Sequence, residues 1–395
     1  MLHFLVACDK CKGSLSAFEI CESAALALHK RFSESKVTQV PLTDGGEGFC
    51  RILTTSASGK IHSLNVLDSV GRNKKVHFGV CNIENLNSEV IKTLDLPSYG
   101  NLAIVEMAQA AGLADLPVSE QNPWKTSSFG VGQILKETAR LGVDAILLGI
   151  GGSSTNDIGL GALNALGLSS KAENGKDISF PLPSVWENIF EIACDELQEL
   201  PPIRIACDVE NKLLGRKGAT SQYGPQKGLP ESDIEEFETQ IRRILSILEP
   251  ICPNVFELSD IKGSGAAGGM GFGLSMFYDV SLVHGFDLIS SWFEIEKKIE
   301  KADFVITGEG KFDQTSLSGK GPFEIIRLSN LKETPCLVMA GSLDSKTARE
   351  VSENFAECDL IAFGKTDWSL EKNLSRAKEN FTETLEQYEF PNLSR

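Results

Sequence analysis

The sequence predicts an α/β protein in which parallel strands alternate with helices and a second domain is inserted into the first. Short apolar runs, each long enough for one strand, end in glycine-rich or acidic turns, and a helical pattern usually follows. Such runs occupy residues 3–8, 37–42, 145–149, 203–207 and 304–307. Ligands of open α/β sheets bind outside the carboxyl ends of the strands. The polar turns after these runs are therefore the first candidates for a functional site.

The middle and the end of the chain follow other patterns. Residues 60–82 alternate in hydrophobicity on both sides of a turn at 71–73, which predicts an antiparallel hairpin. Residues 83–100 and 169–190 are polar and irregular. Because 395 residues suffice for about two or three domains, we expect this middle part to form an inserted domain. Residues 370–385 carry an apolar residue at every third or fourth position and predict one amphipathic helix.

Composition argues against several classes of partner. Acidic residues outnumber basic ones by 54 to 38, which gives a formal net charge of −16 and an isoelectric point of about 4.9. A chain this acidic lacks the basic face with which proteins bind nucleic acid or an anionic membrane surface. No apolar run approaches the roughly 20 residues that span a bilayer, and the N-terminus lacks the basic region and cleavage site of a signal peptide. Most of the ten cysteines stand in apolar stretches, as in a reducing compartment, so we expect a cytoplasmic protein.

Several familiar catalytic motifs are missing from the sequence. It contains no G-x-x-x-x-G-K-[ST] loop, no serine in G-x-S-x-G and no H-E-x-x-H pair. Cys8 and Cys11 form a C-x-x-C, but the helix after it begins too late to activate a thiol and no second pair completes a zinc site. Residues 263–268 match G-x-G-x-x-G without a convincing strand before them, so they predict a dinucleotide site only weakly. Gly268 and Gly269 indicate close approach either to a ligand phosphate or between packed helices.

Residues 149–161 give the strongest signal for an anion site. Gly151 and Gly152 free the backbone to approach a ligand, and the helix expected at 158–166 presents its unpaired N–H groups. Hydroxyl and amide donors come from Ser153, Ser154 and Asn156. Asp157 has two interpretations, because a carboxylate at a helix start either caps the helix or reaches a metal ion.

Three further acidic clusters stand where predicted strands end. They are Asp44 with Glu47, Asp208, and Glu309 with Asp313. A single acidic residue in a turn is usually a turn former or a helix cap, but several beside glycines at one sheet edge favour a function. Carboxylates near phosphate-binding backbone are typical of Mg²⁺, which binds through one or two of them plus phosphate oxygens. The same loops carry lysines that would offset phosphate charge, namely Lys12, Lys227, Lys311 and Lys320. From the residues alone we expect an α/β enzyme with a Mg²⁺–phosphate site. They do not indicate which molecule accepts the phosphoryl group.

A series of motif blocks, in a fixed order over nearly the whole chain, resembles the bacterial glycerate kinases of the glycerate 2-kinase type. The blocks are KGSLSA at 12–17, TDGGEG at 43–48, VEMA at 105–108, AGL at 111–113, GIGGS at 149–153, TND at 155–157, ACDV at 206–209, YGPQKG at 223–228, GAAGG at 265–269 and ITGEG at 306–310, followed by Asp313, Gly319 and Lys320. The chain departs from the family pattern at Cys8 and Cys11, where a proline and an aromatic residue are usual, and at Ile158, where glycine is common.

The resemblance implies an ATP-dependent kinase that phosphorylates D-glycerate, with 2-phosphoglycerate as the usual product. It also implies a flavodoxin-like domain built from both chain ends, which we place at residues 1–60 and 288–395. The inserted α/β domain would then comprise residues 61–287, and the active site would lie in the cleft between the two domains. We expect a monomer or homodimer that takes ATP, Mg²⁺ and D-glycerate.

The same resemblance marks segments to which we assign roles as hypotheses. The nucleotide would be bound by Gly151, Gly152, Ser153, Ser154, Asn156, Gly268 and Gly269. Asp157 or Asp208 would hold Mg²⁺. The glycerate would be bound by Lys12, Gly45, Gly46, Glu47 and Glu309. Lys12 would also clamp the transferring group, and Asp44 or Asp313 would accept the hydroxyl proton.

Other functions stay open at this stage. The chain could phosphorylate another short hydroxy acid, or O3 of glycerate instead of O2. It could also be a non-catalytic sensor that binds a small acid between its domains, and a dinucleotide oxidoreductase is less favoured still.

Overall fold

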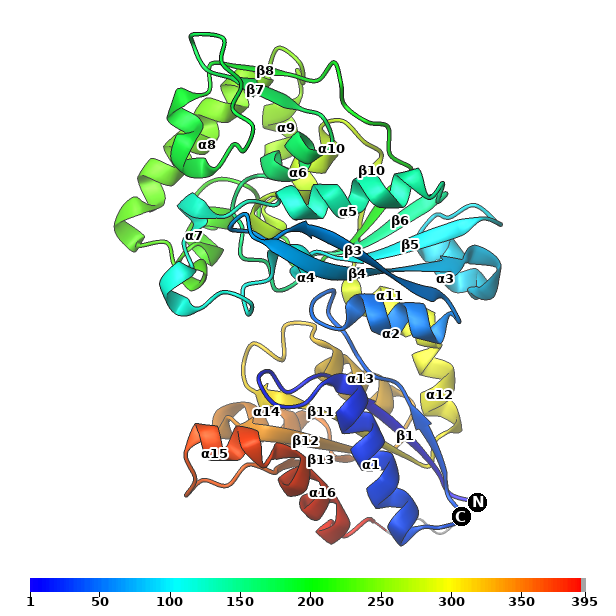
Figure 1. The fold of residues 1–395 in the computed structure, drawn as a ribbon. Helices are drawn as coiled ribbons and strands as arrows, with labels where there is room; N and C mark the ends of the chain where they lie inside the picture. The colour runs from blue at the N-terminus through cyan, green and yellow to red at the C-terminus, as the bar shows by residue number, and fades with distance from the viewer. Residues whose placement is uncertain (392–395) are drawn as a thin grey trace. The chain divides into compact units, whose positions relative to one another are not determined.

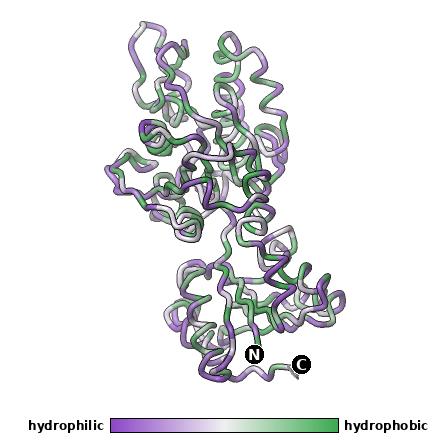
Figure 2. Tube along the Cα trace, turned by 90° about the vertical axis from the view of Figure 1, so that its right-hand side faces the viewer, coloured by the Kyte–Doolittle hydropathy of each residue, from purple (hydrophilic) through white to green (hydrophobic). Residues whose placement is uncertain are grey.

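The structure is a computed structural model that describes residues 1–391, and these form two compact units (Figure 1). Among the described residues, unit 1 comprises 1–44 and 286–391, and unit 2 comprises Gly45–Gly285. Each unit contains a sheet with parallel strands, which confirms the α/β fold class. Hydrophobic and hydrophilic stretches alternate along the chain in both units, as expected when each element buries one face (Figure 2).

The sheet of unit 1 has the strand order of a flavodoxin-like domain, the fold that the family resemblance implies for it. Its elements are β1 (His3–Cys8), α1 (Ala17–Arg31), β2 (Lys36–Gln39), α11 (Gly285–Phe293), α12 (Ile295–Lys301), β11 (Phe304–Phe312), α13 (Gly321–Leu331), β12 (Cys336–Leu343), α14 (Ser345–Asn354), β13 (Cys358–Ala362), α15 (Leu370–Ser375) and α16 (Ala377–Gln387). The strands run in the order β2-β1-β11-β12-β13, and every neighbouring pair is parallel. Numbered within the unit this is 2-1-3-4-5, an order whose ligand crevice lies between β1 and β11.

Strand β1 shows how the sequence builds this sheet. Phe4, Val6 and Cys8 join a core with α1 and α16, which lie side by side. Leu5 and Ala7 are equally buried and, because strand side chains alternate, belong to the other face, where α12 and α13 pack. Both faces of the strand are therefore apolar, as expected for a central parallel strand.

The amphipathic helix predicted over residues 370–385 is in fact two helices. Arg376 leaves helical geometry, with φ −112°, and separates α15 from α16. The apolar positions in α16 belong to the core of unit 1, whereas Leu370 at the start of α15 is exposed. The single periodic stripe therefore serves two different surfaces.

Unit 2 is built around a mixed sheet. Its α-helices and strands are α2 (Phe49–Ser56), β3 (Lys60–Leu67), β4 (Asn73–Asn82), α3 (Ser88–Thr93), β5 (Asn101–Glu106), α4 (Ala108–Ala111), α5 (Phe129–Arg140), β6 (Ala145–Gly149), α6 (Leu160–Ala165), β7 (Ser169–Lys171), β8 (Glu191–Ala193), β9 (Ile203–Ala206), α7 (Ala219–Tyr223), α8 (Ile234–Leu248), α9 (Val255–Ser259), α10 (Met270–Ser275) and β10 (Val280–Val283). The main sheet has the order β10-β9-β6-β5-β4-β3, and β7 pairs with β8 separately. β5, β6, β9 and β10 are parallel, whereas β3–β4 is the predicted antiparallel hairpin.

The unit boundaries differ from those expected from the sequence. Residues 45–60, which the sequence suggests for the first domain, belong to unit 2 because α2 packs on β3, β4 and β5. In doing so α2 buries Phe49, Ile52 and Leu53. At the other boundary, unit 1 resumes at Phe286.

The structure also bears on the G-x-G-x-x-G motif and on membrane-spanning helices. Residues 263–268 follow helix α9 and not a strand, so the G-x-G-x-x-G has no dinucleotide-binding context. Among the described residues no helix has both the length and the apolar composition of a membrane span.

Candidate active site

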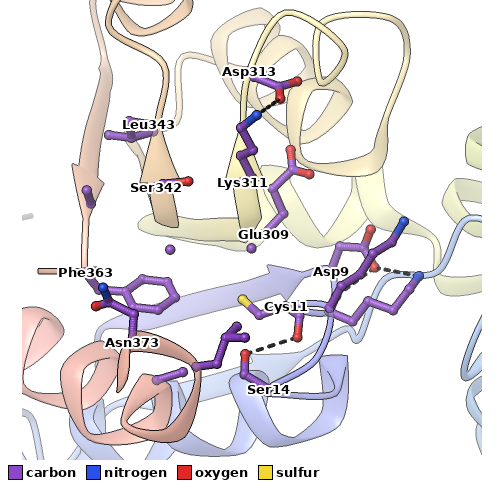
Figure 3. Close-up of a pocket in the computed structure, with 18 of the residues that line it drawn as sticks. Asp9, Cys11, Ser14, Glu309, Lys311, Asp313, Ser342, Leu343, Phe363 and Asn373 are labelled. Carbon is purple, nitrogen blue, oxygen red and sulfur yellow. Dashed lines mark hydrogen bonds and ion pairs between the residues drawn. The ribbon is translucent and has the colours of Figure 1, made fainter. Parts of the chain in front are cut away.

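A cavity of about 560 Å³ lies in unit 1 at the carboxyl end of its sheet (Figure 3). Its walls come from the carboxyl-terminal ends of β11, β12 and β13 and from the segments that follow β1, β2, β11 and β13, together with α15 and the start of α16. It contains four carboxylates, from Asp9, Asp44, Glu309 and Asp313. It also contains five lysines, Lys10, Lys12, Lys311, Lys320 and Lys365. The volume and the mixture of charged and apolar walls are typical of a small-molecule site.

The loop after β1 is held close to β11 by its own backbone. Asp9 N–H donates to Gly308 O at 2.9 Å, which extends the pairing of β1 with β11. Cys11 and Leu15 then exchange two backbone hydrogen bonds, at 2.8 and 3.1 Å, around a tight turn that presents the exposed Lys12. The thiol of Cys11 is buried, and burial raises its pKa to about 12, so it stays protonated near neutral pH. The C-x-x-C is thus a structural turn beside the cavity.

Lys10 joins two carboxylates at one side of the cavity. Its Nζ lies 3.1 Å from Asp44 Oδ1 and 3.6 Å from Asp9 Oδ1. Burial raises the pKa of Asp9 to about 6, with a further contribution from the charge of Asp44, while Lys10 opposes the shift. Asp9 is therefore a carboxylate that exchanges a proton near neutral pH, and Asp44 beside it is more exposed.

β11 and the loop after it carry the second pair of carboxylates, with Glu309 in the strand and Asp313 directly beyond it. Asp313 accepts hydrogen bonds from the Thr315 hydroxyl at 2.7 Å and pairs with Lys311 at 3.0 Å, and these contacts lower its pKa to about 2. Glu309 is buried, which raises its pKa, and its Oε2 lies 3.8 Å from Lys320 Nζ. Within residues 1–391 the other oxygen of Glu309, Oε1, has no hydrogen-bond partner although it is buried.

The glycine-rich loop after β6, in unit 2, differs from the cavity because its serines and its asparagine are buried and hydrogen-bonded within the protein. Ser153, Ser154 and Asn156 are buried, and each has an internal partner. Ser153 Oγ accepts from Lys227 Nζ at 3.0 Å, Ser154 Oγ donates to Ala111 O at 3.0 Å, and Asn156 Nδ2 donates to Thr220 Oγ1 at 2.9 Å. Gly151 N–H donates to Gly45 O at 3.1 Å, whereas Gly152 is exposed with φ +72°. These donors fix the loop within unit 2.

Asp157 lies in the turn before α6, and its carboxylate accepts hydrogen bonds from within unit 2. Its Oδ2 accepts from Ser128 N–H at 2.7 Å, from Ser128 Oγ at 2.8 Å and from Gly161 N–H at 3.2 Å. The carboxyl group is 1% exposed, and burial raises its pKa despite these donors. The next residue, Ile158, has φ +51°, a left-handed conformation that explains why glycine suits this position.

The other candidates of unit 2 also make local contacts. Asp208 Oδ1 accepts from Gly285 N–H at 2.6 Å and lies 3.5 Å from His284 Nε2. A Cβ on Gly268 would meet Thr155 O at 2.3 Å, and one on Gly269 would meet Ile158 Cα at 2.8 Å. Of the two interpretations of these glycines, the structure therefore shows close packing. Gly45 and Gly46 are buried, and Glu47 is exposed.

The structure thus brings together four predicted residues, Lys12, Asp44, Glu309 and Asp313, in one cavity. The predicted nucleotide and metal residues are all in unit 2. Sequence reasoning gave no role to Asp9 or Lys10, although both follow a predicted strand directly, which is a usable signal. The segment described by the structure contains no group of three His, Cys, Asp or Glu side chains placed to hold a metal ion.

Comparison with known proteins gives one consistent family. The family model described as "Glycerate kinase family" matches residues 4–389. The glycerate kinase of Haemophilus influenzae is 34% identical over 87% of this chain and 86% of its own length, and the glycerate 2-kinase of Escherichia coli K12 is 30% identical over 97% and 98%. A solved structure from Salmonella typhimurium LT2, assigned as a glycerate kinase 2, is similar with a TM-score of 0.74 and 30% identity over 98% of this chain and 96% of that one. The chain therefore belongs to the glycerate kinase family, a family of phosphotransferases with an alcohol group as acceptor.

Proposed function

We propose that this protein transfers the γ-phosphoryl group of ATP to a hydroxyl of D-glycerate and forms 2-phosphoglycerate. The observation that carries the proposal is the cavity of unit 1, which combines lysines and carboxylates at the ligand-binding edge of a flavodoxin-like sheet in a chain of this family.

Charge neutralisation in the proposed reaction falls to the lysines of the cavity. Phosphoryl transfer needs positioning and stabilisation of charge more than covalent chemistry. A protein with a net charge of −16 does not attract a polyanion through its overall field, so local cations have to do so. Lys12, Lys311 and Lys320 lie around the cavity, and we assign them to the phosphates and to the glycerate carboxylate.

Proton acceptance falls to the pair Asp9 and Asp44. Both lie within reach of Lys10, which holds them at one side of the cavity. A general base works best when its pKa is near the working pH. Asp313, with a pKa of about 2, is a weaker base than the sequence hypothesis supposes, and we assign it to orienting Lys311.

The cavity also fits a magnesium ion that accompanies the nucleotide. Mg²⁺ binds through one or two carboxylates plus phosphate oxygens, and Glu309 offers a buried oxygen that lacks a partner among the described residues. Glu309 would supply the carboxylate that holds the ion, whose contribution when bound is to neutralise phosphate charge.

For the loop at residues 149–157 we propose a supporting role in place of phosphate binding. Its serines, its asparagine and Asp157 have internal partners, and Gly151 N–H holds the backbone of Gly45. Gly45 follows Asp44 directly in the chain, so this loop would fix the segment from which Asp44 emerges.

A coupled assay of ADP release tests the proposal. The purified protein with Mg-ATP should release ADP with D-glycerate, and less or none with L-glycerate, tartronate or lactate. Phosphorus NMR of the product should show 2-phosphoglycerate. Binding of D-glycerate without ADP release would instead favour a sensor, and a 3-phosphorylated product would correct the acceptor oxygen.

A further inference from the structure

The cavity of unit 1 has an apolar half that the charged groups of the proposed reaction leave unused. Its apolar side chains come from the ends of β12 and β13 and from α15 and α16, namely Leu343, Ala362, Phe363, Leu370, Leu374 and Ala377. Figure 3 shows Leu343 and Phe363 at one side of the cavity and Asp9, Glu309 and Asp313 toward the other. D-Glycerate is small and polar throughout, so it gives this half nothing to bind.

Part of this apolar surface is open to solvent. Leu370 is 74% exposed although it lines the cavity, and Leu343 and Leu374 are half-buried. Phe363 is 3% exposed and is wedged edge-on against Phe381, with ring centroids 5.5 Å apart. Exposed apolar side chains gathered in a concave site indicate a ligand with an apolar part.

The wall behind these side chains is preformed. The Asn373 side chain accepts from Lys365 N–H at 2.8 Å and donates to Lys365 O at 2.9 Å, so its amide clasps the loop after β13. The neighbouring strand ends lie backbone against backbone, since a Cβ on Gly364 would meet Gly341 O at 2.1 Å and one on Gly341 would meet Gly310 O at 2.5 Å. A wall fixed in this way needs no rearrangement to accept a flat ligand.

The apolar half adjoins the lysine loop directly. A Cβ on Gly13 would lie 3.8 Å from Leu374 Cδ1, so the turn that carries Lys12 touches α15. A ligand in contact with Leu374 and Leu370 therefore has cations within the same cavity. Such a ligand is apolar and flat at one end and polyanionic at the other.

From this arrangement we infer that the apolar half binds the base of the nucleoside triphosphate, and that its phosphates extend toward Lys12, Lys311 and Lys320. The inference rests on the proposed function, because it takes the nucleotide as the phosphoryl donor. It places the whole nucleotide in unit 1, whereas the sequence hypothesis placed its phosphates at the loop 149–157 of unit 2.

Two exposed positions in the apolar half allow a test that does not disturb the core. Leu370→Ser removes apolar surface, and Ala362→Trp fills space in the cavity. Leu331→Ser is the matched control, since Leu331 is also in unit 1 and 66% exposed but is not part of the cavity wall. The dissociation constants of ADP and of inorganic tripolyphosphate are measured by calorimetry for each protein.

The base site predicts that the substitutions weaken binding of ADP but not of tripolyphosphate. Leu370→Ser should raise the Kd of ADP about 3- to 10-fold and Ala362→Trp by about 10-fold or more, because each impairs apolar contact with the base. Tripolyphosphate has no base, so its Kd should stay within about twofold of wild type, and the control should match wild type for both ligands. In hydrogen exchange, ADP should protect residues 362–374.

Equal ADP affinity in all four proteins, or ADP protection of residues 149–161 in place of 362–374, would overturn the base site. ADP release with D-glycerate by the same wild-type preparation separates the two proposals. If that release occurs while the ADP affinities do not change, the base site is wrong and the proposed function stands. If the ADP affinities change as predicted without release, the base site stands and the proposed function fails.

Discussion

The carboxyl edges of the two sheets carry similar residues but use them differently. In unit 1, the segment after β1 presents Asp9 and Lys12 to a cavity, and the carboxyl-terminal part of β11 presents Glu309 to it. In unit 2, the segment after β6 turns Ser154 and Asp157 inward, where each has protein partners. Glycines, hydroxyls and carboxylates at strand ends therefore mark either a ligand site or an internal network. The two edges differ in where these side chains lie: those of unit 1 line a cavity, whereas Ser153, Ser154, Asn156 and Asp157 are buried within unit 2.

The largest expected difference between the two sheet edges is in kcat, when a carboxylate at each edge is substituted. Asp44→Asn should lower kcat by about 10²- to 10⁴-fold, the usual contribution of a positioned general base or of a group in direct support of one. Steady-state ADP release with D-glycerate measures it. Glu34→Gln, an exposed acidic position of unit 1 outside the cavity, is the control and should keep wild-type kcat. A wild-type rate in Asp44→Asn would remove Asp44 from the reaction.

A smaller loss is expected from the lysine of the β1 turn. Lys12→Ala should lower kcat/KM for D-glycerate about 10- to 100-fold, because a hydrogen bond to a charged group contributes about 1.5–3 kcal/mol. Initial rates over a range of D-glycerate concentrations give the value. Lys30→Ala, on the surface beside Glu386, serves as the matched change. Equal kcat/KM in Lys12→Ala and wild type would show that this lysine clamps neither substrate.

In unit 2 the expected effect is on stability. Asp157→Asn replaces an acceptor of three hydrogen bonds with a group that also donates, so it should lower the free energy of unfolding by about 1–3 kcal/mol. Urea unfolding measures this, with the exposed Asp177→Asn as control. The kcat of the folded variant should stay within about threefold of wild type. A stable variant without activity would return Asp157 to the metal-binding role suggested from the sequence.

The smallest effect is a change in how stability depends on pH. Burial lowers the pKa of Lys227 to about 7, while an unfolded lysine keeps its proton to a pH of about 10.5. Between these values the unfolded chain binds more protons, so this group makes stability rise with pH, by at most about 1.4 kcal/mol per pH unit. Lys227→Met should flatten that rise, which urea unfolding at pH 7, 8, 9 and 10 would show. An unchanged slope would mean that Lys227 is charged in the folded protein.

The sequence predicts much of the fold because its signals are local. Apolar runs such as residues 3–8 and 304–307 became β1 and β11, and the alternation over residues 60–82 became the β3–β4 hairpin. The resemblance to a family supplied the flavodoxin-like order, which no single run specifies. The boundary near residue 60 was misplaced because α2 is amphipathic and nothing in its sequence says which sheet it covers.

The candidate site was predictable in part. Asp44, Glu309 and Asp313 line one cavity, as expected if acidic residues near strand ends gather at one edge of a parallel sheet. The same rule could not foresee the internal contacts of Asp157 and Ser154, since their hydrogen-bond partners Ser128 and Ala111 are distant in sequence. Position 158 gave a clearer signal about the backbone. Glycine is common there in the family, and the backbone of Ile158 is indeed left-handed.

The central claim is that phosphoryl transfer takes place in the cavity of unit 1 and that the loop after β6 only supports it. Parallel measurement of D-glycerate-dependent ADP release by Asp44→Asn and Asp157→Asn, below the melting temperature of both, tests this most directly. We predict that Asp44→Asn loses nearly all activity and Asp157→Asn keeps most of it. The reverse pattern would place the chemistry at the loop of unit 2 and contradict the claim.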